Sequence, residues 1–256
     1  TFIYSDINFV LLGALVERAS GKSLAEFTRQ RVFAPLKMRR TMFNPPATLR
    51  RAIAPTERVE GTILRGVVHD PTARYMGGVA GHAGLFSTAD DLGRFAAMIL
   101  NGGRLDGARI FSPLTVEKMT SPQTPPNQPI QRGLGWDIES PFASNRGELL
   151  PVGSFGHTGF TGTSLWIDPV TKTYVVLLAN SVHPKQRPAI VSLRARVATA
   201  VAAALPGLSP ELVSKAGLRL TGYNEAMTGA RRDVWRNAKV LTGLDVLVRD
   251  EFKQLK

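Results

Sequence analysis

A polar turn punctuated by glycine occupies residues 156–168, which read GHTGFTGTSLWID. Because glycine has no side chain, its three copies here let other groups approach the backbone closely. His157 and Thr158 add two polar side chains at the edge of the strand that the following residues predict. Such a turn can hold backbone N–H groups against a substrate.

A second polar set stands near the start of the chain, where Tyr4, Ser5 and Asp6 lead into a stretch of helical periodicity. Ser5 or Asp6 can cap this helix, and Gly21 ends it. Tyr4 and Asp6 are therefore expected at a helix N-terminus. The apolar residues of this helix recur at the spacing of one face, namely Ile7, Val10, Leu11, Ala14 and Leu15.

Three more helices are predicted before the strands. Ser23 begins a capping box with Glu26, and the helix that follows should stop before Pro35. Residues 44–83 show little periodicity and predict a long, ordered loop, of the kind that often forms a functional rim. A short helix is expected over residues 113–119. Another begins at Ser87 or Thr88, ends at Asn101, Gly102 and Gly103, and has an apolar face of Leu92, Phe95, Ala96, Ile99 and Leu100.

Strands are predicted at residues 134–138, 162–167 and 174–178. The last two are joined by an Asp-Pro turn at residues 168–172, which favours an antiparallel hairpin. Helices, then antiparallel strands, then a helix predict an α+β fold with helices flanking an antiparallel sheet. The final helix should have Pro188 in its first turn and Ile190, Leu193, Val197 and Val201 on its apolar side.

The composition of 256 residues with 43% apolar content suffices for one large core and an appendage. No apolar run reaches the roughly 18 residues of a membrane helix. There is no cysteine, and the four histidines at 69, 82, 157 and 183 show no metal-ligand spacing, so we predict neither a metal nor another cofactor.

The net charge of +12 is uneven, because residues 184–256 hold 13 Lys or Arg against 6 Asp or Glu. Such a segment could attract an anionic surface, or it could be a solvated helix face and linker. No zinc finger, RNP-like aromatic pattern or helix-turn-helix is recognisable, so we predict no nucleic-acid partner. Residues 205–232 read as a linker, and residues 233–256 as the start of a second domain.

Residues 1–204 resemble the penicillin-recognising serine hydrolases, in the branch that holds class C β-lactamases, low-molecular-weight penicillin-binding proteins and related esterases. The resemblance lies in five segments in the family's order: YSDINFVLLGALVERASGKSL, VFAPLKM, GHAGLFSTADDLGRFAAMIL, GLGWD and GHTGFTGTSLWIDP. It implies a β-lactamase/transpeptidase-like fold and acyl-enzyme chemistry on a nucleophilic serine.

The resemblance also implies roles for individual residues. Tyr4 matches the family's catalytic tyrosine, which moves a proton between serine, lysine and leaving group. His157, Thr158 and Gly159 match its Lys-Thr-Gly triad, with histidine in place of lysine. Phe160 would supply an oxyanion-binding N–H. Asp6 stands where many relatives have an asparagine that binds the substrate amide; a carboxylate cannot donate that hydrogen bond.

Each of these residues also has a purely structural interpretation. Tyr4 could be a packing residue of an amphipathic helix, and His157 a turn histidine. His82 lies in a glycine-rich segment that resembles the rim of the family's cleft, where it could contact substrate or serve structure alone. His69 and His183 are assigned to the surface or to packing.

The family's Ser-x-x-Lys nucleophile motif does not occur in these residues, since no serine has a lysine three positions later. We therefore expect a C-terminal portion of the domain, incomplete at its N-terminus and inactive alone, with the nucleophile on a covalently linked upstream segment. The tail, NAKVLTGLDVLVRDEFKQLK, resembles the start of exo-β-N-acetylmuramidases, although it could equally be an amphipathic helix. Both resemblances imply a peptidoglycan-derived or small-molecule substrate and a periplasmic or extracellular location.

Three function classes stay open on the sequence. The parent could be a serine hydrolase acting on an ester, a peptide or a β-lactam, a non-catalytic cell-wall binding module on the same fold, or a protein tethered to the wall by its basic segment. Fold alone does not choose among them.

Overall fold

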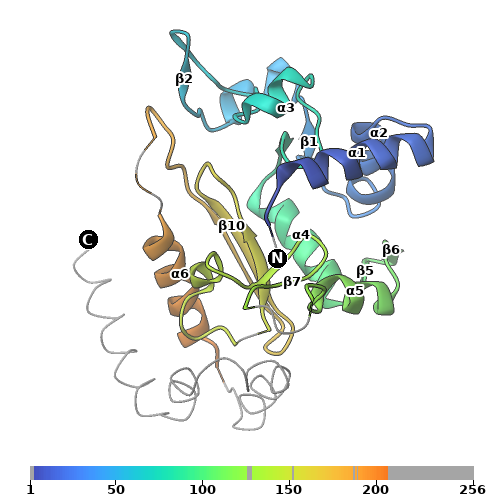
Figure 1. Ribbon diagram of the computed structural model, residues 1–256, viewed down its shortest axis with the longest axis vertical. Helices are drawn as coiled ribbons and strands as arrows, with labels where there is room; N and C mark the ends of the chain where they lie inside the picture. The colour runs from blue at the N-terminus through green and yellow to red at the C-terminus, as the bar shows by residue number, and fades with distance from the viewer. Residues whose placement is uncertain (1–2, 126–128, 152, 187, 189, 207–256) are drawn as a thin grey trace. The chain divides into compact units, whose positions relative to one another are not determined.

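The computed structural model describes residues 3–125, 129–151, 153–186, 188 and 190–206 (Figure 1). It combines helices with antiparallel strands, which confirms the predicted α+β class. The chain divides into two compact units. Of the described residues, the first unit holds those within 3–117, 159–163 and 176–190, and the second holds those within 118–158, 164–175 and 191–206.

The first unit begins with a helical pair. Ser5 stands at the N-cap position of α1, although its side chain makes no capping hydrogen bond. The C-cap is Gly21 in the left-handed conformation, as the sequence predicts. Ser23 Oγ accepts a hydrogen bond from the Glu26 N–H and caps the second helix. The elements are α1 (Asp6–Ser20), α2 (Leu24–Thr28) and the π-helical turn η1 (Arg29–Phe33).

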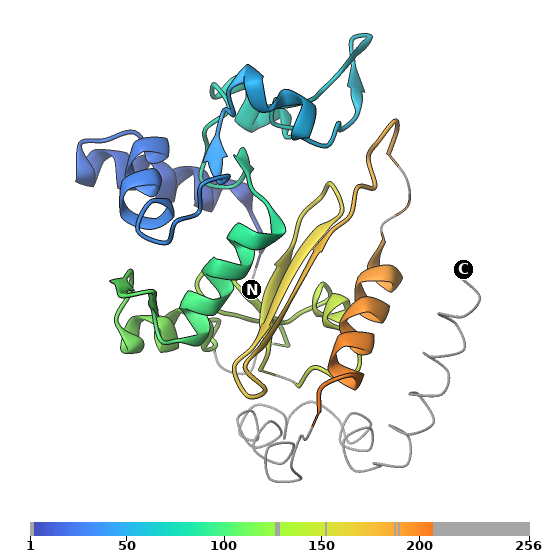
Figure 2. The same ribbon diagram turned by 180° about the vertical axis from the view of Figure 1, so that it is seen from behind.

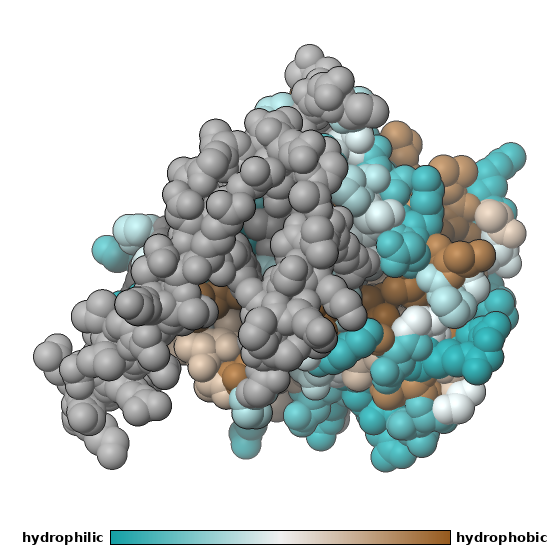
Figure 3. All heavy atoms as spheres, turned by 90° about the horizontal axis from the view of Figure 1, so that it is seen from below, coloured by the Kyte–Doolittle hydropathy of each residue, from teal (hydrophilic) through white to brown (hydrophobic). Residues whose placement is uncertain are grey.

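The apolar face predicted for α1 is not its buried face. Gly13 is the one buried residue of this helix, whereas Ile7, Leu11 and Leu15 are 67%, 59% and 61% exposed. The helical periodicity correctly identified the residues that share the apolar face of α1, but no other described residues bury this face. Apolar residues reach the surface in several places, and Figure 3 shows some of them among hydrophilic neighbours.

A glycine-rich loop packs against the other side of α1. A Cβ atom at Gly81 would lie 1.9 Å from the carbonyl oxygen of Phe9, which no side chain could tolerate. A Cβ at Gly13 would meet the Gly81 N–H at 3.3 Å. The two backbones therefore touch because both positions are glycine.

Residues 44–83 contain short helices and strands rather than one long, ordered loop, which corrects the sequence prediction. Short elements interrupt them, because local caps and tight turns can order a segment that lacks long-range periodicity. Asp70 caps a one-turn helix by accepting a hydrogen bond from the Ala73 N–H at 2.7 Å. The segment contains η2 (Ala47–Ala52), a hairpin of β2 (Arg58–Val59) and β3 (Thr62–Ile63), and α3 (Pro71–Tyr75).

The helix α4 (Ala89–Leu100) is capped by Thr88, as predicted, but it buries a different set of residues. Asp91 is buried because its Oδ2 accepts hydrogen bonds from the Arg40 N–H and the Thr41 hydroxyl, each at 2.8 Å. The helix therefore turns Asp91, Gly93, Ala96, Met98 and Ile99 inward; Leu92, Phe95 and Leu100 of the predicted face are only partly buried.

Two further short strand pairings belong to the first unit. The predicted helix at 113–119 is present as α5. Pairs form between β1 (Met42–Phe43) and β4 (Leu85–Phe86) and between β5 (Arg104–Leu105) and β6 (Ala108–Arg109), and α5 spans Pro113–Thr120.

The second unit is built on a five-stranded sheet with the order β11-β10-β9-β8-β7. Asp168 is fully buried and accepts hydrogen bonds from the N–H groups of Val170 and Thr171 at 3.0 Å, which forms the predicted hairpin turn. The strands are β7 (Gln131–Arg132), β8 (Asp137–Glu139), β9 (Phe155–Thr158), β10 (Thr163–Asp168) and β11 (Thr173–Leu178).

The core of this unit lies between the sheet and α6 (Val191–Ala203). Trp166 packs there with Val175 of β11 and Ala198 of α6, and Figures 1 and 2 show the helix running alongside the sheet. The short helix η3 (Ala143–Arg146) joins the same core. Pro188 and Ile190 precede α6 rather than forming its first turn, which corrects the predicted start.

The predicted linker at 205–232 lies almost wholly outside the described residues, and the second domain predicted at 233–256 lies entirely outside them. Within the described part of the chain, no helix has the length and apolar content needed to cross a bilayer.

Candidate functional site

The triad-like residues lie where β9 runs into its turn. His157 pairs with Leu165 and Thr158 with Ser164, so both lie at the end of β9, which stands between β10 and β8 in the sheet. His157 Nδ1 lies 2.9 Å from the Thr158 carbonyl oxygen. Because a carbonyl can only accept, Nδ1 must bear the hydrogen. The neutral ring therefore has its lone pair on Nε2, and only the protonated ring can donate from Nε2.

A buried carboxyl accompanies His157 in the second unit. Asp137 lies on β8 opposite Gly156, and its Oδ2 accepts a hydrogen bond from Ser140 Oγ at 2.7 Å. Its Oδ1 has no hydrogen-bond partner among the described residues. Burial raises the pKa of Asp137 above 3.8, and the Ser140 hydrogen bond and the charges of Arg132, His157 and Arg146 oppose this rise only in part. Sequence reasoning missed Asp137, whose one signal was its place at the end of the GLGWD segment.

The turn after Thr158 belongs to the first unit, and two of its N–H groups are bonded within the turn. The Gly159 N–H donates to the Thr163 carbonyl at 2.8 Å, and the Gly162 N–H donates to the Gly159 carbonyl at 3.1 Å. The Phe160 N–H makes no hydrogen bond with any described residue. The predicted oxyanion donor is thus an N–H group that the hydrogen bonds of the turn leave unused.

Close contacts fix the shape of this turn. Gly162 has φ 122° and a Cβ there would lie 2.7 Å from the Ala179 carbonyl oxygen. The Thr161 carbonyl accepts a hydrogen bond from the Ser181 N–H at 2.7 Å. The turn is therefore held by the segment that follows β11.

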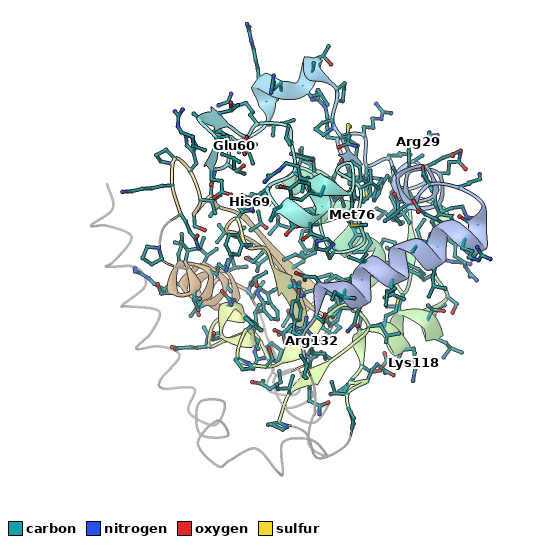
Figure 4. The ribbon with its side chains drawn as sticks, turned by 45° about the horizontal axis from the view of Figure 1, so that its top comes forward. Arg29, Glu60, His69, Met76, Lys118 and Arg132 are labelled. Carbon is teal, nitrogen blue, oxygen red and sulfur yellow. The ribbon has the colours of Figure 1, made fainter. Side chains whose placement is uncertain are left out.

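The side chain of Phe160 rests on His69. The two rings stack with centroids 5.3 Å apart and planes inclined by 29°. His69 lies on the segment leading into α3, and Met76 lies at the end of that helix (Figure 4). His69 Nε2 is 3.1 Å from Glu57 Oε1, but the geometry does not make a hydrogen bond, so the contact is electrostatic. The sequence had assigned His69 to packing or surface and gave no sign of this contact.

His82 forms a pair with Asp70. Its Nε2 lies 2.9 Å from Asp70 Oδ1, and the side chain of His82 is only 4% exposed. Its Nδ1 is buried without a hydrogen-bond partner among the described residues. Burial alone would raise the pKa of Asp70, but hydrogen bonds from Ala73 and His82 and the charges of His82 and His69 lower it below 3.8.

Tyr4 and Asp6 lie at the N-terminus of α1, and both are exposed. Because Gly81 touches Phe9, the loop bearing His82 lies against this helix. Within the first unit, α1 thus contacts the loop of His82, and His82 pairs with Asp70. Asp70 follows His69 in the chain, and the His69 ring contacts Phe160. His157 and Thr158 belong to the second unit, so the meeting of Tyr4 with His157 stays a prediction.

His183, which the sequence assigned to surface or packing, places its Nδ1 2.8 Å from the Thr56 carbonyl oxygen. Among the residues that the structure describes, no three histidine, aspartate or glutamate side chains gather where a metal ion could be held.

Known proteins share much of this sequence. A protein of Escherichia coli K12, provisionally named D-alanyl-D-alanine carboxypeptidase, is 35% identical over 199 residues, which are 71% of this chain and 45% of that protein. An N-acetylmuramyl-L-alanine amidase of Bacillus subtilis 168 is 36% identical over 204 residues, covering 71% of this chain and 44% of the amidase. The chain thus spans less than half the length of these relatives.

The fold is also shared. A crystal structure of a β-lactamase from Mycobacterium bovis superposes with a TM-score of 0.55 at 23% identity, over 78% of this chain and 62% of that one. The beta-lactamase family model matches residues 1–199, which include α1, the glycine-rich loop and the turn after β9. These matches confirm the resemblance drawn from the motifs, and the chain belongs to the beta-lactamase family.

Proposed function

We propose that this chain is part of a serine hydrolase that acts through an acyl-enzyme on an ester, peptide or β-lactam related to the cell wall. The observation that carries the proposal is the turn after β9, where His157 and Thr158 precede an N–H group at Phe160 with no hydrogen-bond partner among the described residues. The names of the relatives support a peptidoglycan-derived substrate and a periplasmic or extracellular location.

In the proposed reaction, a serine oxygen from a Ser-x-x-Lys segment attacks the substrate carbonyl. Its proton passes to lysine or Tyr4 and then to the leaving group as the carbonyl bond to that group breaks. The Phe160 N–H stabilises the oxyanion, and losing one such donor typically costs about 100- to 1,000-fold in rate. Water then attacks the acyl-serine, and the released serine regains a proton.

His157 has a restricted role in this scheme. Because its Nδ1–H is engaged by the Thr158 carbonyl, the neutral ring has only an acceptor at Nε2. Only the protonated ring can donate to a substrate carboxylate. The proposal therefore favours substrates without a carboxylate at that position over typical β-lactams.

The serine is proposed to lie on an upstream segment that packs against the exposed apolar face of α1. Two observations support this: no Ser-x-x-Lys occurs in the 256 residues, and Ile7, Leu11 and Leu15 are more than half exposed beside Tyr4. Burial of such a face is a normal source of stability.

The test compares the isolated chain with the complete product of its gene. We expect residues 1–256 to hydrolyse neither nitrocefin nor p-nitrophenyl esters and to bind no fluorescent penicillin. The complete protein should hydrolyse at least one ester or peptide substrate, and a serine-directed inhibitor should abolish this turnover. Turnover by the isolated chain would overturn the proposed location of the nucleophile.

The lack of Ser-x-x-Lys in this sequence also favours a second candidate, a non-catalytic module that binds cell-wall material. This candidate predicts no acylation of the complete protein and retention on purified peptidoglycan. A salt titration separates it from simple tethering by basic residues, because an electrostatic contact weakens as ionic strength rises.

A further inference from the structure

The Phe160 side chain is largely exposed to solvent. It is 68% exposed at the tip of a turn formed by residues 159–163, and its ring lies on His69. A ring stacked at this distance and angle is in attractive contact. The ring and the N–H of Phe160 belong to one residue, so a contact that orients the ring also restrains the amide.

His69 is itself held from several directions. Its side chain is 14% exposed, and its Nε2 faces Glu57 Oε1 at 3.1 Å. Arg74 Nη1 donates to the His69 carbonyl oxygen at 3.0 Å and to the Val68 carbonyl oxygen at 3.1 Å. The next residue, Asp70, caps α3 and pairs with His82. The ring of His69 therefore projects from a backbone that is fixed on both sides.

A second set of hydrogen bonds connects the turn to the segment around Glu57. The Ser181 N–H donates to the Thr161 carbonyl at 2.7 Å, while Asn180 Nδ2 donates to the Pro55 carbonyl at 2.6 Å. His183 Nδ1 lies 2.8 Å from the Thr56 carbonyl oxygen, next to Glu57. Residues 180–183 thus connect the turn to the segment that bears Glu57.

We propose that His69 is a positioning residue, which holds the Phe160 ring and thereby aims the Phe160 N–H at the reacting carbonyl, with Glu57 fixing the His69 ring. This inference rests on the proposed function, in which that N–H binds the oxyanion. A misplacement of about 1 Å in a catalytic group can cost about 100-fold in rate. His69 touches no reacting atom, so it acts through Phe160 alone.

The first test measures the turn without any substrate. In residues 1–256, hydrogen exchange of the Gly162 N–H, which is bonded within the turn, is measured by NMR for the unsubstituted chain, His69→Ala and His69→Phe. His69→Ala should accelerate this exchange at least about fivefold, and His69→Phe, which keeps a stacking ring, should stay within about twofold. Tyr75→Ala is the matched control, because its aromatic ring is 92% exposed. Unchanged exchange in His69→Ala, with a cooperative unfolding transition, would overturn the inference.

The second test uses the complete protein and an activated ester. His69→Ala should lower kcat about 10- to 100-fold while KM stays within about twofold, and His69→Phe should restore most of kcat. Equal kcat in His69→Ala and the unsubstituted protein would refute the catalytic part of the inference. Absence of turnover in the unsubstituted protein would instead overturn the proposed function, and the exchange measurement would still decide whether His69 positions the turn.

Discussion

At the scale of single residues, the chemistry of the candidate site depends on which nitrogen or oxygen is already occupied. The Thr158 carbonyl takes the Nδ1–H of His157, and the turn takes the N–H groups of Gly159 and Gly162. The Phe160 N–H, which makes no hydrogen bond with a described residue, is the group that a substrate could meet. The sequence predicted these residues through their motif, but it could not predict the occupied atoms, because they depend on local backbone geometry.

Replacing His157 by lysine tests the substrate preference argued from this geometry. Lysine brings a permanent cation with three donors, so His157→Lys should accelerate acylation of the complete protein by a carboxylate-bearing penicillin about tenfold relative to a neutral ester. Leu114→Lys adds the same charge at a residue that is 82% exposed, and it should change neither rate. The ratio of the two acylation rates is the measurement, and an unchanged ratio in His157→Lys would argue against a substrate contact at this position.

The Asp70–His82 pair predicts an acid-sensitive contribution to stability. A carboxyl whose folded pKa lies below its unfolded value stabilises the fold when ionised, and this contribution is present above pH 3.8 and lost as pH falls through the lower folded pKa. Asp70→Asn keeps a capping oxygen but loses the charge. Its unfolding midpoint should therefore be lower than that of the unsubstituted chain at neutral pH, and the difference should shrink below pH 3.8.

Denaturant unfolding across pH measures this effect. Glu60→Gln removes one negative charge from an exposed turn and is the matched control, with little change expected. A constant difference between Asp70→Asn and the unsubstituted chain from neutral to acid pH would contradict the account.

At the scale of elements, caps and turns were predictable and buried faces were not. Thr88 and Gly21 delimit their helices as the sequence indicates, and Asp168 forms the hairpin turn. The apolar stripe of α1 was identified, yet its buried side is the one with Gly13. Periodicity reports which residues share a face; it does not report that two glycines will bring a loop backbone against the opposite side.

The contact between α1 and the glycine-rich loop has a direct test. In Gly81→Ala the new Cβ would lie 1.9 Å from the Phe9 carbonyl oxygen, so helix and loop must separate, at a cost of about 3 kcal/mol in the free energy of unfolding. Gly77→Ala is the control: it has φ 80° and open space around it, so it should cost about 1 kcal/mol through backbone strain. Equal losses in the two variants, measured by urea unfolding, would show that the contact is not tight.

At the scale of the whole molecule, the chain spans less than half of its relatives and has an exposed apolar helix face beside Tyr4. The family and the α+β class were predictable because several motifs occur in order over nearly 200 residues. The placement of Tyr4 near His157 stays a prediction, since these residues belong to separate compact units and no local pattern specifies how distant segments meet. The resemblance of residues 233–256 to a muramidase concerns residues outside the described part and stays a prediction.

The central claim is that Tyr4 serves a serine on a linked segment and that acylation occurs there. Intact-mass and peptide mass spectrometry of the complete protein, treated with a penicillin or a p-nitrophenyl ester, tests it most directly. The account predicts one covalent acyl group on the serine of a Ser-x-x-Lys motif, formed at least about 100-fold more slowly in Tyr4→Phe, which lacks the proton-transferring hydroxyl. Absence of any acyl-serine under conditions where the protein is folded, or equal acylation rates with and without the Tyr4 hydroxyl, would contradict it.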